Sequence, residues 1–387
     1  MFSTESAQNH DQKLNGEKPA WSTQDVPNHA FVLLETRKFG FEERPMPTLQ
    51  SPRDVLIRVI ATGLCGSDIH YWHHGRIGKY VVENPIILGH ESAGIVEACG
   101  PDVKSLAVGD RVALEPGVGC NTCEACRSGR YNLCGSMRFA ATPPYDGTLA
   151  TYYVLPEECC FVLPSHISFQ EGALVEPLAV AVHCCRLAGD MQGKSAIVFG
   201  AGPIGLLACA VARASGAATV VAVDIVQSRL DFATRFGATA TYLMSSQLPE
   251  VNADIMLAQT RLSEGADVIV EATGAEPCIN CGIHALKRGG IFVQAGLGTP
   301  VVSFPVAQIC DKEATFKGSF RYGPGDYKLA VELLQSGRIS VKELVTHEFS
   351  FAEAEQAFIN VLERRGIKSI IYGPSVDQTL VNETAML

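Results

Sequence analysis

The stretch SAIVFGAGPIGLLACAVARAS, residues 195–215, contains the pattern that decides the fold. An apolar run ends at Gly200, and a Gly-x-Gly-x-x-Gly sequence formed by Gly200, Gly202 and Gly205 leads into a second apolar run. This order predicts a buried strand, a tight turn and a helix from about Pro203 to Ser215. The glycines would let the backbone approach a pyrophosphate closely at the N-terminus of the helix. The stretch therefore predicts a dinucleotide site.

A carboxylate follows at the distance that this kind of site requires. Asp224 stands nineteen residues after Gly205, at the end of the apolar run TVVAVD. Asp224 can accept hydrogen bonds from the adenosine ribose hydroxyls, and its charge would repel a 2′-phosphate. We therefore expect NAD as the cofactor in preference to NADP. Arg229, five residues further on, could lie along the adenine or pair with acidic side chains, and the sequence does not choose between these roles.

The runs around this stretch predict the fold class. Residues 195–212 carry no charge and are long enough to raise a membrane span, but glycines and Pro203 interrupt them near the middle. The runs SAIVFG, TVVAVD, DVIVE and IFVQAG are apolar throughout and alternate with helical segments. Such runs are typical of a parallel sheet covered by helices on both faces. We therefore predict an α/β domain with a doubly wound parallel sheet, the Rossmann arrangement.

The segments on either side have a different character. From Phe31 to Tyr153, short apolar runs are broken by Gly and Pro, which predicts a strand-rich, barrel-like domain with long loops. Residues 1–28 are polar, lack the apolar core of a secretory signal, and are expected to form a disordered extension. After about Gly318 come two helical segments and a last strand, IKSIIYG, which we expect to pack back onto the first domain.

Composition excludes several classes of protein. The chain has 387 residues, 47% of them hydrophobic, and a net charge of −10, which argues against nucleic acid or an anionic membrane as the main partner. Its 14 cysteines do not indicate a secreted disulfide scaffold, because such scaffolds are short chains with a signal peptide. We expect a reduced compartment and a cytoplasmic protein.

Four cysteines fall within CNTCEACRSGRYNLC, residues 120–134. Cys120, Cys123, Cys126 and Cys134 supply enough thiolates for a closed tetrahedral zinc site with no position left for a substrate. An iron–sulfur cluster and a zinc-ribbon nucleic-acid module are the rival interpretations, and the acidic chain weighs against the second. The cluster is therefore expected to brace a loop.

A second set of possible ligands is scattered along the chain. Cys65, His90, Glu91 and Glu176 offer one sulfur, one imidazole and one or two carboxylates, which suit an open zinc site with a position for water or an alcohol. Spacing alone does not establish this site, because a lone Cys or His is more often a packing residue.

Several motifs together resemble the zinc-dependent medium-chain alcohol dehydrogenases, from about Phe31 to Gly373. These motifs are GHE-x2-G-x5-G (89–100), VGDRV (108–112), the cysteine quartet and GAGPIG. Others resemble the sorbitol and xylitol dehydrogenases in particular, namely CGSDIHYW, GRYNLC, ATPPYDGTLA, EGALVEPLAVAVH and SFRYG. The segment SFRYGPGDYKLAVELL is most similar to fungal xylitol dehydrogenases. The full quartet, which mammalian sorbitol dehydrogenases lack, favours a structural zinc and a microbial-type enzyme.

The resemblance implies roles for individual residues. Cys65, His90 and Glu91 match the catalytic zinc ligands, and Glu176 matches a position that either holds the zinc-bound water or ligates the metal, so both carboxylates remain candidates. Ser67 matches the hydroxyl that takes the alcohol proton, and His70 is a candidate to relay it. The positions that match the polyol pocket are Tyr71, Glu176, Arg321 and Tyr322. Those that match cofactor contacts, besides the three glycines, are Ile204, Asp224, Arg229, Gly296, Leu297, Ser319 and Phe320.

The resemblance also implies an organisation and an activity. Residues 29–177 and 319–387 would form a catalytic GroES-like barrel domain, and residues 178–318 an NAD-binding Rossmann domain. Each subunit of a homotetramer would hold NAD, a catalytic zinc and a structural zinc. The expected reaction is oxidation of a secondary alcohol of a polyol to the ketose. Xylitol is favoured over sorbitol or arabinitol, and a non-catalytic NAD-binding protein is the alternative of a different class.

Overall fold

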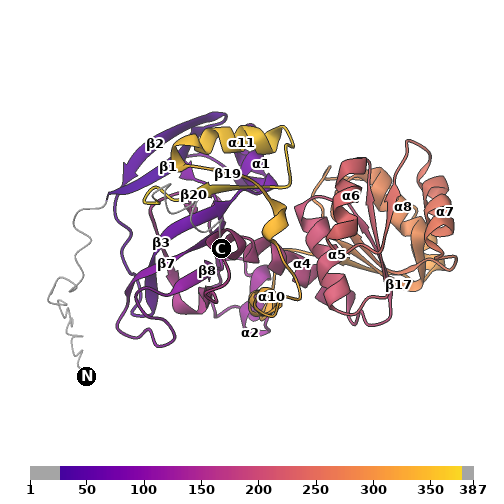
Figure 1. The fold of residues 1–387 in the computed structure, drawn as a ribbon, viewed down its shortest axis with the longest axis horizontal. Helices are drawn as coiled ribbons and strands as arrows, with labels where there is room; N and C mark the ends of the chain where they lie inside the picture. The colour runs from indigo at the N-terminus through magenta and orange to yellow at the C-terminus, as the bar shows by residue number, and fades with distance from the viewer. Residues whose placement is uncertain (1–26, 377–387) are drawn as a thin grey trace, which may run out of the picture.

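The computed structural model describes residues 27–376. The predicted disordered extension lies outside the described residues except at its last two positions, where strand β1 (Asn28–Glu35) begins. Figure 1 shows two lobes side by side, one formed by the two ends of the described chain and the other by its middle. No helix within residues 27–376 combines the length and apolar character needed to cross a membrane.

The middle of the chain folds around a six-stranded sheet in the order β15-β14-β13-β16-β17-β18, with every neighbouring pair parallel. The strands are β13 (Ser195–Phe199), β14 (Thr219–Asp224), β15 (Ala240–Leu243), β16 (Ala266–Glu271), β17 (Leu286–Gln294) and β18 (Thr315–Gly318). The order reverses at β13, as expected of a doubly wound sheet. The predicted α/β fold class is confirmed.

Helices cover both faces of this sheet because its strands are apolar on both sides. Ala196 and Val198 of β13 belong to one buried cluster, and Ile197 and Phe199 belong to another on the opposite face. The helices of this lobe are α5 (Pro203–Ala214), α6 (Gln227–Arg235), α7 (Pro249–Thr260), α8 (Glu276–Ala285) and α9 (Val306–Asp311). The predicted strand, turn and helix at residues 195–215 are thus β13, the glycine turn and α5.

The other lobe is rich in strands, as predicted. Its main sheet has seven strands in the order β12-β8-β7-β3-β20-β19, with β11 paired to β3 as well. These strands are β3 (Asp54–Gly63), β7 (Glu91–Cys99), β8 (Arg111–Leu114), β11 (Tyr152–Pro156), β12 (Cys160–Val162), β19 (Val345–Phe349) and β20 (Lys368–Tyr372). A three-stranded sheet joins β1 to β2 (Lys38–Arg44) and β6 (Ile86–Ile87). Two small two-stranded sheets pair β4 (Arg76–Ile77) with β5 (Tyr80–Val81) and β9 (Gly117–Val118) with β10 (Arg138–Phe139).

The remaining helices connect and surround these sheets. They are α1 (Gly66–His74), α2 (Glu124–Arg127), α3 (Phe169–Ala173), α4 (Val175–Ala188), α10 (Asp326–Gln335) and α11 (Ala354–Leu362), with short 3-10 turns at Tyr131–Leu133, Glu157–Cys159, Lys342–Leu344 and Phe351–Glu353. Helix α4 lies at the junction of the two lobes and runs across the predicted domain boundary between residues 177 and 178. The division into residues 29–177 with 319–387 and residues 178–318 remains a prediction.

The last strand returns to the first lobe. Strand β20 pairs antiparallel with β3, so that Ile370 lies opposite Gly63 and Tyr372 opposite Ala61. Figure 1 shows this yellow C-terminal segment beside the indigo strands from the start of the described chain. The return places the N-terminal end of β20 next to the loop that follows β3.

Candidate active site and metal centres

Three of the scattered ligand candidates meet at the ends of β3 and β7, two central strands of the seven-stranded sheet. Cys65 precedes α1 as its N-cap, His90 lies directly before β7, and Glu91 is the first residue of that strand. Their ligand atoms all lie within 4.8 Å of one another. Zinc bonds of about 2.0 to 2.3 Å in a tetrahedral arrangement separate ligand atoms by roughly 3.3 to 3.8 Å. The three side chains therefore suit a zinc ion after small adjustments, and a fourth position stays open to a further ligand.

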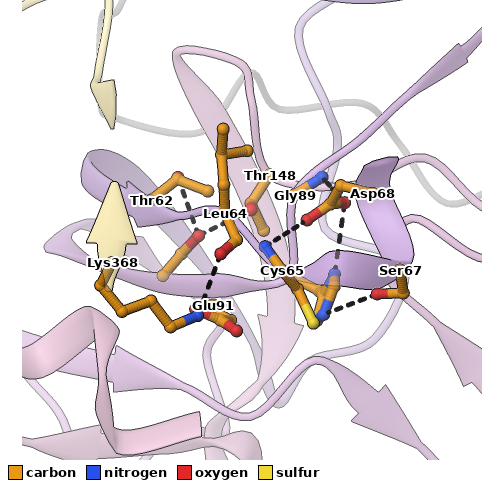
Figure 2. A network of polar contacts seen from close by, with 11 residues as sticks. Thr62, Leu64, Cys65, Ser67, Asp68, Gly89, Glu91, Thr148 and Lys368 are labelled. Carbon is orange, nitrogen blue, oxygen red and sulfur yellow. Dashed lines mark hydrogen bonds and ion pairs between the residues drawn. The ribbon is translucent and has the colours of Figure 1, made fainter. Parts of the chain in front are cut away.

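Asp68 holds two of these residues in place, a role that the sequence analysis missed. Its buried carboxylate accepts hydrogen bonds from the backbone N–H groups of Cys65 and Gly89, each at 3.0 Å, and lies 3.5 Å from His90 Nδ1 (Figure 2). Burial opposes the charged form of His90, but Asp68 outweighs it and raises the pKa of His90 well above its usual range. A carboxylate on one imidazole nitrogen leaves the other free for a metal.

Lys368 is a second residue that the sequence analysis missed. Its Nζ forms an ion pair with Glu91 Oε2 and donates a hydrogen bond to the Leu64 carbonyl at 3.0 Å, as Figure 2 shows. The side chains of Lys368 and Glu91 are only 3% and 1% exposed. Burial lowers the pKa of Lys368, but the negative charge of Glu91 outweighs burial and raises it. One of the two candidate metal carboxylates is thus paired with a buried cation.

The other predicted catalytic residues are Glu176, Ser67 and His70. They differ in burial and in their contacts with the three ligands. Glu176 is buried in the first turn of α4, and burial raises the pKa of its carboxyl to about 7, although His90 favours the charged form. Glu176 is not among the three residues whose ligand atoms meet, so the geometry favours Glu91 as the metal ligand. The Ser67 hydroxyl lies 3.5 Å from His90 Nε2, and His70 is exposed on the same helix, α1. The roles of these residues remain predictions.

Phe139, which the sequence analysis did not single out, lies between His90 and Arg321, one of the residues predicted to line the polyol pocket. The guanidinium of Arg321 lies 3.6 Å from the centre of the Phe139 ring, and that ring lies 5.8 Å from the imidazole of His90. Tyr322 is buried, and its hydroxyl has no hydrogen-bond partner among the described residues. Tyr71 is also buried, which raises the pKa of its phenol. Arg321 has a left-handed backbone, with φ of 56°.

The cysteine quartet forms a separate cluster whose four sulfur atoms lie within 4.8 Å of one another. The sulfurs of Cys120 and Cys126 are 4.0 Å apart, close to the roughly 3.8 Å that tetrahedral zinc–thiolate bonds require. The Thr122 side chain and backbone N–H groups lower the pKa of Cys120 to about 5, which favours the thiolate that binds metals. These residues fit a closed zinc site.

The glycine turn has the shape that a pyrophosphate needs. A Cβ atom at Gly205 would lie 1.7 Å from the Gly200 carbonyl oxygen, and Gly200 has a φ of +92°, so side chains are excluded at both positions. A Cβ at Gly202 would meet nothing within 4 Å, which leaves room beside the first turn of α5. Ile204 lies in that turn. The turn therefore fits a dinucleotide phosphate at the helix N-terminus.

The remaining predicted cofactor residues lie along the C-terminal ends of the strands. The Asp224 carboxylate accepts hydrogen bonds from the N–H groups of Ala201 at 2.8 Å and Val226 at 3.0 Å, and Arg229 Nη1 lies 4.0 Å from it. Arg229 thus lies beside an acidic side chain, one of the two roles left open. Gly296 and Leu297 follow β17, and Ser319 and Phe320 follow β18.

Comparison with known proteins agrees with this geometry. Residues 51–165 match the model of the alcohol dehydrogenase GroES-like domain, and residues 203–336 match that of the zinc-binding dehydrogenases. A probable D-xylulose reductase A of Neosartorya fischeri is 55% identical over 91% of this chain and 98% of its own length. D-xylulose reductase A of Aspergillus niger is 53% identical over 91% of this chain and 99% of its own.

Solved structures place the fold in the same group. L-idonate 5-dehydrogenase of Escherichia coli superimposes with a TM-score of 0.82 at 28% identity, covering 90% of this chain and 98% of that one. Galactitol-1-phosphate dehydrogenase of the same organism gives a TM-score of 0.80 at 29% identity, with 89% and 99% coverage. The chain therefore belongs to the zinc-dependent medium-chain alcohol dehydrogenases, in the branch that contains the fungal D-xylulose reductases.

Proposed function

We propose that this chain is an NAD-dependent zinc polyol dehydrogenase that oxidises xylitol to D-xylulose and reduces the ketose in the reverse direction. The observation that carries the proposal is the meeting of Cys65, His90 and Glu91 beside Arg321, in a chain with 53–55% identity to proteins named D-xylulose reductase. Such a reaction has a place in pentose catabolism.

The chain's own residues divide the work of the reaction. Zinc held by Cys65, His90 and Glu91 would act as a Lewis acid that lowers the pKa of a substrate hydroxyl, and bound NAD would accept the hydride. Ser67 Oγ takes the hydroxyl proton, and His70 relays it to solvent from the same helix. Glu176, buried in the first turn of α4, would orient a water beside these three ligands or serve as a further ligand, and it places a polar group beside the polyol.

The polyol pocket combines one cation with hydroxyl and carboxyl groups. Arg321, held over Phe139, donates to hydroxyls remote from the reacting carbon, and the free Tyr322 hydroxyl can do the same. Tyr71 and Glu176 complete the wall. A chain of adjacent hydroxyls matches several donors at once, whereas a simple alcohol leaves these buried polar groups without partners.

Initial rates with a panel of pentitols and hexitols test the proposal directly. We expect the highest kcat/KM for xylitol, and lower values for sorbitol and arabinitol. Zinc-containing protein that forms no NADH from any polyol would overturn the proposal and favour the non-catalytic NAD-binding alternative. A preference for sorbitol or arabinitol would reassign the substrate but keep the reaction.

The cofactor preference rests on Asp224. We propose NAD, because the charge of the Asp224 carboxylate would repel a 2′-phosphate, and among the described residues Arg229 is the one cation within 4.0 Å of that carboxylate. Rates with NAD and then NADP measure the preference, and equal kcat/KM for the two cofactors would contradict this assignment.

Assembly and location are further parts of the proposal. We propose a cytoplasmic homotetramer. Strand β18 lies at an edge of the six-stranded sheet, and Val301, Phe304, Val306 and Phe316 around it are exposed apolar residues that a second copy of the chain could cover. Light scattering after size-exclusion chromatography tests the assembly, and a monomer at micromolar concentration would contradict it.

A further inference from the structure

A cavity of about 390 Å³ lies away from both cysteine-containing clusters, and we call it the arginine cavity. Its walls come from the C-terminal half of α5, the end of α6 and residues 338–343, which follow α10. Arg213, Arg235 and Arg338 line it, with Glu343 as the single acidic residue of the lining. The size is within the range of pockets that hold small molecules.

The charge of the arginine cavity contrasts with that of the chain. The whole chain carries a net charge of −10, yet three guanidinium groups and one carboxylate leave this cavity with a net charge of about +2. Within the described residues, none of the three arginines lies within 4.0 Å of a carboxylate oxygen, whereas seven other arginines of the chain do. The positive charge therefore remains uncompensated.

Helix capping explains part of this arrangement. Arg213 Nη1 donates to the carbonyls of Ala217 at 2.7 Å and Ala218 at 3.3 Å, and Arg338 Nη2 donates to the carbonyl of Ala214. Cations and donors near a helix C-terminus are stabilising, so these two bonds have a local purpose. Each uses one terminal nitrogen and leaves the other donors of the planar group free.

Arg235 is the last residue of α6, where a cation is also favourable, but unlike the other two arginines it donates to no carbonyl within the described residues. Its exposed side chain makes no hydrogen bond or ion pair within residues 27–376, and its guanidinium lies 5.4 Å from the centre of the Phe232 ring. A third arginine whose donors are all free within the described residues, on the wall of a cavity already lined by two others, points to an anion that all three can reach.

We propose that the arginine cavity binds the phosphate monoester of a small sugar or polyol. A phosphate monoester carries close to two negative charges at neutral pH, which matches the net charge of the lining, and its oxygens accept the paired donors of guanidinium groups. A carboxylate would neutralise only half of that charge. The cavity also has room for the few carbon atoms that the phosphate would carry.

This site is distinct from the cofactor site. Helix α5 begins at the glycine turn and spans twelve residues, so its two ends are about 18 Å apart, and the arginine cavity lies toward the far end. The phosphate would contact Arg213 and Arg235 from the Rossmann lobe and Arg338 from the segment after α10. Binding would therefore join two parts of the chain that are distant in sequence.

Calorimetric titration of the full chain saturated with NADH tests the proposal, because the cofactor's own phosphates then occupy the glycine turn. The probes are D-ribose 5-phosphate, inorganic phosphate and D-ribose. We expect saturable binding of the sugar phosphate, weaker binding of inorganic phosphate and no binding of ribose. The variant R235Q should weaken binding by about tenfold, the lower range for losing hydrogen bonds to a charged group.

Matched variants separate the arginine cavity from general charge effects. R213Q should weaken binding as R235Q does, while R364Q, which removes an exposed arginine elsewhere, should leave it unchanged. Because Arg235 makes no bond within the described residues, its variant should keep the melting temperature and the polyol activity of the parent. Equal binding by all variants, equal binding of ribose, or no binding of the sugar phosphate at 10 mM (about 2.7 kcal/mol of binding free energy) would overturn the proposal.

Discussion

The two metal centres are built in opposite ways. The quartet of Cys120, Cys123, Cys126 and Cys134 lies in one loop with a four-residue helix that has no buried residue, so its own chain neighbours assemble it. Cys65, His90 and Glu91 come from the ends of core strands, and Lys368 pairs with Glu91 from 277 residues away. The loop cluster is a local structure that a metal can close, whereas the other is a product of the whole sheet. Substitutions in the two should therefore fail differently.

The largest difference should appear in turnover. Cys65→Ser removes a predicted ligand of the open site and should lower kcat by at least about a thousandfold, roughly 4 kcal/mol of transition-state stabilisation. The melting temperature should change little, because the surrounding sheet does not depend on the thiol. Steady-state rates and thermal unfolding of the same preparation check both expectations. Cys310→Ser, at an exposed cysteine, is the control, and a Cys65→Ser enzyme that retains full turnover would remove the contrast.

Cys123→Ser should lower stability first and turnover only as a consequence, the opposite of Cys65→Ser. Opening the four-thiolate shell should lower the melting temperature by about 10 °C and the zinc content from two ions to one per chain, because a structural zinc contributes folding free energy directly. Activity should fall as the protein unfolds. Metal analysis and calorimetry measure the two quantities. A variant with unchanged stability, unchanged zinc content and no turnover would move the reaction centre to the loop.

Lys368→Met tests whether the ion pair serves the metal or only the fold. Removing the cation leaves Glu91 buried and unpaired in zinc-free protein, a loss of about 3 to 5 kcal/mol, but bound zinc would compensate the same charge. The gap between the melting temperatures of zinc-loaded and chelator-treated protein should therefore widen by about 5 °C relative to the parent.

The control for this test is Lys312→Met. The Nζ of Lys312 donates to the carbonyls of Ile283, His284 and Leu286 at 2.6 to 2.9 Å, and none of these residues belongs to either metal centre. Its loss should lower both melting temperatures equally. If Lys368→Met also lowers both equally, Lys368 has only a structural role.

The smallest expected effect is that of a residue in the quartet loop on substrate binding in the polyol pocket. Asn132, within the quartet segment, donates from Nδ2 to the Phe320 carbonyl at 2.9 Å, next to Arg321. Asn132→Ala should raise KM for xylitol by about fivefold, close to 1 kcal/mol, with zinc content unchanged. Asn280→Ala removes a similar bond to Ser303 and should leave KM unaltered. Equal KM in both variants would mean that the loop does not position the pocket.

The local helices, strands and turns could be predicted from the sequence for physical reasons. The helix predicted from Pro203 to about Ser215 is α5, Pro203–Ala214. It could be predicted because the strand, the glycine turn and the helix depend on residues that are close together in the sequence. The predicted boundary after Pro177 falls inside α4, since proline is tolerated in the first turn of a helix and does not end it there. Glu176 lies in that same turn, so the start of α4 fixes the direction of its side chain.

Contacts between segments that are distant in the sequence could not be predicted from it. The run IKSIIYG was predicted correctly as a strand, but its partner β3 follows from the tertiary fold, and a lysine at a strand end normally indicates an exposed position. Asp68 was within a quoted motif, yet its role depends on Gly89 lying beside the start of α1. Phe139 lies between Arg321 and His90 only because three distant segments converge.

The position of β20 has a consequence for the order in which the protein is made. A ribosome releases the quartet loop early, so a metal could close it while most of the chain is still unsynthesised. Glu91 also emerges early, but its counter-ion follows 277 residues later, on the last strand of the described sheet. The catalytic centre would therefore mature only after Lys368 has been synthesised, and a product truncated before Lys368 would carry a complete cysteine quartet beside an incomplete reaction site.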